Sequence, residues 1–127
     1  MFSHIFVGSN DLDKAKYFYD AIFAAIGAKT GFVDPKGRVI YRHNGAMLMV
    51  AKPLDGATAT VSNGGTIGFT MASPEQTDAW HAAGVAAGGT SVEDPPGVRN
   101  GNGMSLYLAY LRDPDGNKLC GMYAMPK

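Results

Sequence analysis

Few side chains in this 127-residue chain have the types and spacing that chemistry requires. Cys120 is the only cysteine, which excludes an internal disulfide and a cysteine-clustered zinc site. The three histidines, His4, His43 and His81, are far apart, and no Ser-His-Asp or Cys-His arrangement can be argued from their order.

Several arginine and tyrosine side chains have both a structural and a binding interpretation. Arg99 can receive an anionic group, although an arginine in a loop is more often solvated. Tyr41, Tyr107 and Tyr110 each combine an aromatic ring with a polar tip, which suits a pocket wall as well as a core. The glycines at 101 and 103 do not follow a strand and precede a helix, so they predict no phosphate-binding loop.

An internal repeat indicates which elements position these side chains. At an offset of 62 residues, residues 3–28 match residues 65–90, with Phe18 opposite Trp80. Each copy starts as an alternating apolar strand, passes through a polar turn into a helix with a core-facing aromatic residue, and ends at a glycine. The chain is therefore predicted to contain two equivalent modules in a single domain: about 1–57 and 64–127, with a linker at 58–63.

The helix starts and the following strands can be placed from capping and turn signals. In the second copy Ser73 is a natural N-cap, Pro74 suits the first helical position and Gln76 stands at capping-box distance. In the first copy Asn10 or Asp11 can cap. The apolar stripe predicted for the first helix is Tyr17, Phe18, Ile22 and Ile26. Strands are predicted at 29–33, 38–43, 46–51, 90–93, 104–112 and 118–123, with hairpin turns at 34–37 and 113–116. Each copy thus reads βαβββ, and 97–103 is predicted to be a mobile loop.

Composition narrows the partners. Eleven basic and eleven acidic residues cancel, and no run of like charge exceeds two residues, so we expect no nucleic-acid partner and no membrane surface. The longest apolar stretches, such as 21–28, are far shorter than the roughly 20 residues of a membrane span. With one cysteine and a strand at the start of the chain, the sequence predicts a cytoplasmic location.

The two ends of the chain carry recognisable motifs. It opens with His4-Ile5-Phe6-Val7, continues through Asn10-Asp11-Leu12 into a helix containing Tyr17-Phe18-Tyr19, and closes with Asp113-Pro114-Asp115-Gly116-Asn117-Lys118. The whole chain resembles the vicinal-oxygen-chelate superfamily, which includes glyoxalases, bleomycin-resistance proteins and extradiol dioxygenases. The resemblance rests on these motifs, on the distance between them and on the internal repeat.

The resemblance implies an α+β fold of two βαβββ modules in tandem. Their strands would form a curved, mostly antiparallel sheet around a cleft, with both helices on the convex side. Members are typically homodimers or fused pairs, and many use a divalent metal in the cleft to bind two neighbouring oxygens of a substrate. The reactions differ between subfamilies, so the fold alone does not select one.

Strand alternation predicts which side chains face the cleft. If Ile5 and Val7 pack on the helices, His4 and Phe6 face the other way, and Thr66 is the counterpart of His4 in the second copy. The arm at 96–110 resembles one that contributes an arginine and a tyrosine to the cleft in near relatives. The predicted ligand-binding cleft comprises His4, Phe6, Met47, Met49, Thr66, Arg99, Tyr107, Cys120 and Met122; no catalytic residue is assigned.

The resemblance also identifies four positions at which metal-using relatives carry ligands. In this chain they are His4, Met49, Thr66 and Cys120, and only His4 is of the usual ligand type. A divalent metal that orients two substrate oxygens needs about three nitrogen or carboxylate ligands. We therefore expect no cofactor, with a divalent metal bound through His4 as the alternative.

Three functions follow as hypotheses. The first is a small-molecule-binding protein with a degenerate metal site, whose cleft takes an apolar or aromatic ligand. The second is a metal-dependent, glyoxalase-like lyase or isomerase, or a dioxygenase, with unusual ligands. The third is a metal-free acid/base enzyme that uses His4 and Tyr107. A homodimer is expected from the resemblance in each case.

Overall fold

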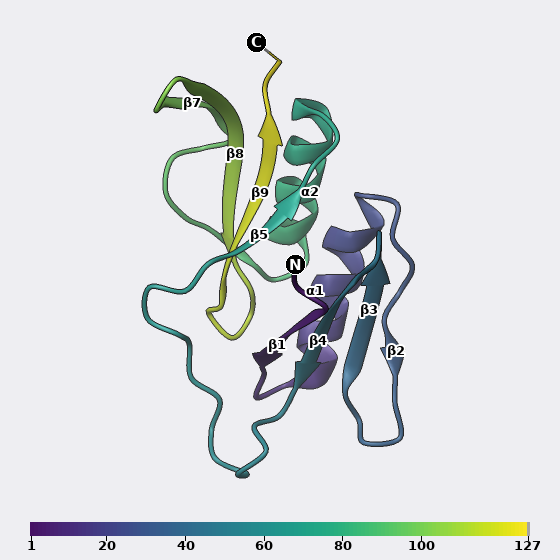
Figure 1. Cartoon of the computed structure of the whole chain (residues 1–127). Helices are drawn as coiled ribbons and strands as arrows, with labels where there is room; N and C mark the ends of the chain where they lie inside the picture. Colours follow the sequence, from purple (N-terminus) through teal and green to yellow (C-terminus); the bar gives the residue numbers. More distant parts are fainter. Residues whose placement is uncertain (127) are drawn as a thin grey trace.

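The computed structural model describes residues 1–126, which form two modules side by side (Figure 1). The first module contains β1 (His4–Gly8), α1 (Leu12–Ala24), β2 (Phe32–Val33), β3 (Val39–His43) and β4 (Ala46–Ala51). The second contains β5 (Ile67–Thr70), α2 (Pro74–Ala86), β6 (Thr90–Ser91), β7 (Gly97–Gly101), β8 (Met104–Arg112) and β9 (Lys118–Ala124). The α+β class and the repeat are confirmed, since the two helices have equal length and start 62 residues apart.

Each module has its own mixed sheet. The strand order is β1-β4-β3-β2 in the first sheet and β5-β9-β8-β6 in the second, with β7 also paired to β8. The first strand of each module runs parallel to the last, and the other pairs are antiparallel. Both predicted turns close with the expected hydrogen bond, from Gly37 to Asp34 and from Gly116 to Asp113, at 2.9 Å each.

The helices begin where the capping signals place them. The Asp11 side chain accepts a hydrogen bond from the Lys14 amide, and the Ser73 hydroxyl accepts one from the Gln76 amide. Pro74 occupies the first turn of α2. These side chains satisfy backbone donors that a helix N-terminus leaves unpaired, so both starts are determined locally.

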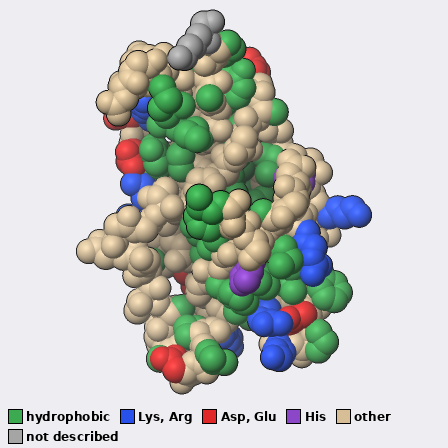
Figure 2. Space-filling model, viewed as in Figure 1, with side chains coloured by type: hydrophobic (Ala, Val, Ile, Leu, Met, Phe, Trp, Pro, Cys, Tyr) green, Lys and Arg blue, Asp and Glu red, His purple; other side chains and the backbone are tan. Residues whose placement is uncertain are grey.

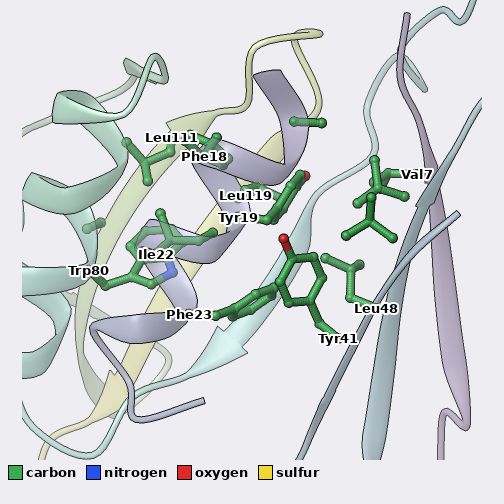
Figure 3. Packing of buried hydrophobic residues seen from close by; sticks show 14 of the residues in the cluster. Val7, Phe18, Tyr19, Ile22, Phe23, Tyr41, Leu48, Trp80, Leu111 and Leu119 are labelled. Atoms are coloured by element: carbon green, nitrogen blue, oxygen red, sulfur yellow. The ribbon is translucent and has the colours of Figure 1, made fainter. Parts of the chain in front are cut away.

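One apolar core joins the two modules (Figure 3). A chain of aromatic rings crosses it, from Trp80 on α2 through Phe69 on β5 and Phe23 on α1 to Tyr41 on β3. The centroid separations along this chain are 6.3, 5.4 and 4.8 Å. The modules therefore share their buried surface instead of each burying its own.

The structure corrects three local predictions. Residues 97–101 form β7 instead of a mobile loop, because Asn102 and Gly103 adopt positive φ angles of 52° and 73° and turn the chain into a hairpin with β8. Tyr17 is 69% exposed, and Tyr19 takes the buried place on α1. The strands predicted at 29–33 and 90–93 are only two residues long.

Between residues 1 and 126, no helix has the length and apolar character needed to cross a membrane.

Candidate functional site

The two sheets meet at a seam between strands β1 and β5. In the described part of the chain, β1 pairs only with β4 and β5 only with β9, so no backbone ladder joins the sheets. Two cavities open along this line, and both include Ile5 of β1 and Ile67 of β5 in their walls. Side chains, not backbone hydrogen bonds, therefore determine the space between the modules.

The first cavity, which we call the seam pocket, encloses about 280 Å³. It lies between the start of β1, the β3–β4 hairpin, the end of α1 and strand β5. Its walls are mostly apolar and aromatic. The apolar lining is Phe2, Ile5, Phe23, Ile26, Ala28, Ala46, Met47, Leu48, Ile67, Gly68 and Phe69, together with the ring of Tyr41.

Four further residues, His4, His43, Asn44 and Thr70, bring polar groups to the seam pocket. None of the residues that line it is Asp, Glu, Lys or Arg. Nδ1 of His4 lies 2.8 Å from Oγ of Ser3, which leaves Nε2 free of that contact. The imidazole also lies edge-on to Phe6 at 5.9 Å, so the ring has two fixed contacts.

The hydroxyl of Tyr41 is already used within the protein. It donates a hydrogen bond to Oδ1 of Asp20 at 2.7 Å. Burial and this carboxylate raise the pKa of Tyr41 far above its ordinary value. Burial alone would raise the pKa of Asp20, but hydrogen bonds from Lys16, Gly31 and Tyr41 outweigh it and hold that pKa below its usual range. Tyr41 therefore offers the pocket an aromatic ring and no acid.

The second cavity, of about 320 Å³, is more polar. It is lined by β1 and β5 and by parts of the linker and of the turn before β9. Its residues are Ile5, Phe6, Val7, Gly8, Thr60, Ser62, Gly65, Thr66, Ile67, Asn117 and Lys118. Lys118 forms an ion pair with Glu93, and its ammonium lies 5.0 Å from the Tyr110 ring centroid.

The predicted cleft residues divide among separate places. His4 and Met47 line the seam pocket, whereas Phe6 and Thr66 line the second cavity. Met49, beside Phe6 in the β1–β4 register, is 8% exposed and lines neither.

Cys120 and Met122 lie on the open face of β9, opposite the helix-facing Leu119. Cys120 is 7% exposed, and Met122 is 41% exposed. Burial raises the pKa of Cys120 despite a hydrogen bond from Tyr110, so the thiol is not activated as a nucleophile.

Arg99 and Tyr107 do not come together. Tyr107 has the same alternation as the buried Ala109 and Leu111, and its hydroxyl donates to Oδ1 of Asp78 on α2 at 2.8 Å. That hydrogen bond raises the pKa of Tyr107. Arg99 donates to the backbone carbonyls of Gly97 and Asp94, both at 3.0 Å. Tyr107 therefore lies on the helix side of its sheet, away from His4, which is unfavourable for an acid/base pair of these two residues.

The residues at the four metal-ligand positions do not fit a catalytic divalent metal. Their donors are one imidazole, one buried thioether, one hydroxyl and one buried thiol of raised pKa, and His4 and Thr66 line different cavities. Residues 1–126 contain no group of three or more His, Cys, Asp or Glu side chains that could hold a metal. A metal that activates water or orients two oxygens usually has about three such donors from the protein.

Several pocket residues were not identified from the sequence. His43 ends β3 before a hairpin turn, a position from which no pocket role was predicted, and it lines the seam pocket. Strand alternation places Gly68 on the same side as Thr66, and Thr70 continues this alternation, so the signal for Thr70 was present in the sequence. Phe23 and the end of α1 could not be assigned to a pocket, because only tertiary packing brings them to the seam.

Comparisons with known proteins agree on the fold. A glyoxalase/bleomycin resistance protein from Albidiferax ferrireducens T118 has 51% sequence identity and a TM-score of 0.92, over 96% of this chain and 98% of that one. A putative glyoxalase from Bacillus halodurans has 19% identity and a TM-score of 0.74, over 96% and 94% of the two chains. A glyoxalase/bleomycin resistance protein/dioxygenase family enzyme from Burkholderia phytofirmans PsJN has 17% identity and a TM-score of 0.72, over 97% and 98%.

A search of curated proteins found no significant match in sequence. The family model of the Glyoxalase/Bleomycin resistance protein/Dioxygenase superfamily matches residues 1–120. The two βαβ-type modules that meet at a seam agree with this match and confirm the resemblance noted in the motifs. The chain therefore belongs to the Glyoxalase/Bleomycin resistance protein/Dioxygenase superfamily.

Proposed function

We propose that this protein binds a small apolar or aromatic molecule in the seam pocket, without a catalytic metal. The observation that carries the proposal is the lining, in which aromatic and aliphatic side chains surround about 280 Å³ and a few polar groups are added. Ligand sites are commonly concave, mostly apolar and provided with a few polar groups that fix orientation.

The size of the pocket limits the ligand. A cavity of roughly 150 Å³ lined by apolar side chains can hold benzene. The seam pocket has nearly twice that volume, so one or two fused rings fit its dimensions. The donor set at the metal-ligand positions does not support the metal-dependent lyase or dioxygenase alternative.

Gly68 provides a direct test, because a side chain built there enters open space. A Cβ atom at Gly68 would have no heavy atom within 4 Å, and the residue lines the seam pocket. Gly68→Leu is therefore expected to fill the pocket without distorting β5. Isothermal titration calorimetry with the neutral probe 2-naphthamide should show binding to the wild type and at least tenfold weaker binding to this variant.

Gly101→Leu is the matched control, since a Cβ atom at Gly101 also meets nothing within 4 Å but the residue lies on β7, outside the pocket. It should bind 2-naphthamide like the wild type. Equal binding by the wild type and Gly68→Leu would place the probe elsewhere and contradict the proposal, as would an absence of binding to the wild type.

A further inference from the structure

We infer that the ligand of the seam pocket is a neutral, flat heteroaromatic molecule with an N–H donor beside a C=O acceptor on one edge, as in a lactam. The backbone N–H and C=O of Gly68 recognise this edge. The inference rests on the proposed function and adds the chemical class of the ligand. It follows from the free edges of β1 and β5 and from a strand glycine that the fold itself does not need.

The side of β5 that faces away from β9 is a free strand edge. The Met71 amide donates to the Met122 carbonyl at 2.8 Å, so the odd-numbered residues of β5 direct their backbone groups towards β9. Successive residues of a strand direct these groups to opposite edges, so those of Gly68 and Thr70 point away from β9. Both residues line the seam pocket, and within residues 1–126 β5 has no second partner strand. Each therefore offers a donor beside an acceptor.

Strand β1 has a free edge at the same pocket. The Ser3 carbonyl accepts a hydrogen bond from the Met47 amide at 3.1 Å. At the other end of the strand, the Ser9 amide donates to the Ala51 carbonyl at 2.9 Å. Odd-numbered residues here thus face β4, and His4 directs its backbone groups away from β4. In the described part of the chain β1 and β5 do not pair, so the pocket lies beside two strand edges that can accept a hydrogen-bonding partner (Figure 1).

Neither backbone conformation nor packing explains the glycine at position 68. Its φ angle is not in the left-handed region, and a Cβ atom there would meet no heavy atom within 4 Å. By contrast, a Cβ atom at Gly121 on the neighbouring strand would lie 2.9 Å from the Trp80 ring. A glycine inside a strand weakens it and often marks a place where a ligand approaches the backbone closely. Gly68 therefore leaves the β5 edge accessible to a flat group.

The side chains beside this edge suit the face of an aromatic ring. Phe23, Tyr41 and Phe69 line the pocket, and the Phe23 centroid lies 4.8 Å from that of Tyr41 and 5.4 Å from that of Phe69. Figure 2 shows hydrophobic side chains gathered where the two modules meet, beside a histidine. A flat ligand in the seam would present its edge to Gly68 and one face to the apolar side chains on the helix side of β5.

The lining favours a ligand without charge. None of the residues that line the seam pocket is Asp, Glu, Lys or Arg, so an ionised ligand would meet no carboxylate, ammonium or guanidinium there. A lactam needs no counter-charge. Its N–H donates to a backbone carbonyl and its C=O accepts from a backbone amide, as two residues do in a hydrogen-bonded strand pair.

The pair 2-quinolone and coumarin tests the recognised edge. Both have two fused rings of nearly the same shape and the same carbonyl group, but coumarin has a ring oxygen where 2-quinolone has its N–H. Coumarin would therefore leave the Gly68 carbonyl without a donor and place a second oxygen against it. Calorimetric titration should show that 2-quinolone binds about tenfold more tightly than coumarin. Gly68→Leu should weaken 2-quinolone binding at least tenfold, whereas Gly101→Leu should leave it unchanged.

Hydrogen exchange of single amides, measured by nuclear magnetic resonance, locates the contact. Saturation with 2-quinolone should slow the exchange of the Gly68 amide about tenfold, because its N–H then donates to the ligand. The amide of Gly101 on β7 lies outside the pocket and should exchange at the same rate with and without the ligand.

Three results would overturn the inference. If 2-quinolone and coumarin bind equally and Gly68→Leu blocks both, the seam pocket is a ligand site that does not select a lactam edge, and the proposed function stands. If the Gly68 amide is already protected in the free protein, another strand covers the edge. If neither of these probes nor 2-naphthamide binds, the proposed function fails together with the inference.

Discussion

Tyr19 and Asp113 form a buried hydrogen bond that ties α1 to the turn before β9. The hydroxyl of Tyr19 donates to Oδ2 of Asp113 at 2.6 Å, and both residues are at most 3% exposed. Burial and the carboxylate raise the pKa of Tyr19 well above its ordinary value, so the phenolic hydroxyl stays protonated. The same carboxylate accepts hydrogen bonds from the amides of Asp115 and Asn117, which shape the turn.

Removal of this hydroxyl tests how strongly it joins the modules. Tyr19→Phe should lower the free energy of unfolding by about 2 kcal/mol, because a buried carboxylate loses a donor. Urea denaturation followed by circular dichroism measures the change. Tyr17→Phe on the same helix is the control: Tyr17 is 69% exposed, so the change should stay within about 0.5 kcal/mol. Equal effects of the two variants would contradict the role assigned to the buried bond.

Sequence reasoning at this scale identified residue types better than their partners. The turn at 113–116 was predicted from proline and glycine positions, but a turn signal does not show that Asp113 also accepts a bond from a helix 94 residues earlier. His4 was identified from the motif, while His43 was missed because its exposure depends on how the hairpin meets α1. Partners across modules depend on packing, which no local pattern encodes.

At the scale of elements, the second glycine after α2 permits a close approach. A Cβ atom at Gly89 would lie 2.4 Å from the Phe18 ring and about 3 Å from the backbone oxygens of Gly84 and Arg112. Gly27, its counterpart in the first copy, has nothing within 4 Å and instead adopts a φ of 81°. The glycines matched by the repeat therefore serve different physical needs.

Gly89→Ala should destabilise the protein by about 2 kcal/mol, the usual range for overpacking a filled interior. The backbone oxygens cannot move without disturbing α2 and β8, so relaxation is limited. Gly101→Ala provides the comparison, since a Cβ atom there meets open space and the change should be small. Thermal unfolding of both variants gives the answer, and a Gly89 variant as stable as the wild type would disprove the close contact.

The elements also show why β7 was missed. The Asn-Gly pair at 102–103 turns a hairpin, as the pair at 44–45 does between β3 and β4, but it lies in a glycine- and asparagine-rich stretch that favours a loop. Pairing with β8 overcomes the low strand propensity of that stretch. The existence of β7 depends on a neighbouring strand, whereas the two helices could be predicted locally, from strong N-caps in both and from periodic apolar residues in α1.

At the scale of the whole molecule, the common core implies that both modules unfold together. Trp80 reports on the second module by fluorescence, and far-ultraviolet circular dichroism reports on both. Because Trp80 connects to α1 through Phe69 and Phe23, the two urea transitions should coincide. Phe23→Ala should shift both midpoints together, by an amount equivalent to about 3 kcal/mol. Separate transitions in either protein would show independent modules.

The overall architecture was the part best predicted from sequence, since a repeat over both halves constrains topology. The homodimer and the cytoplasmic location stay predictions. The cleft was predicted as one surface, but the seam is divided into two cavities that share Ile5 of β1 and Ile67 of β5 in their walls. That division depends on side-chain volumes at the seam, which strand alternation alone does not determine.

Among the residues described, no backbone ladder joins β1 to β5. This feature affects how the ligand specificity of such a protein can evolve. His4, Met47, Gly68 and Thr70 line the pocket but are not part of the common core. Substitutions at these positions can reshape the cavity while the sheets and the aromatic chain remain intact. Single substitutions along the seam can therefore change the ligand preference during evolution, while every intermediate sequence still folds.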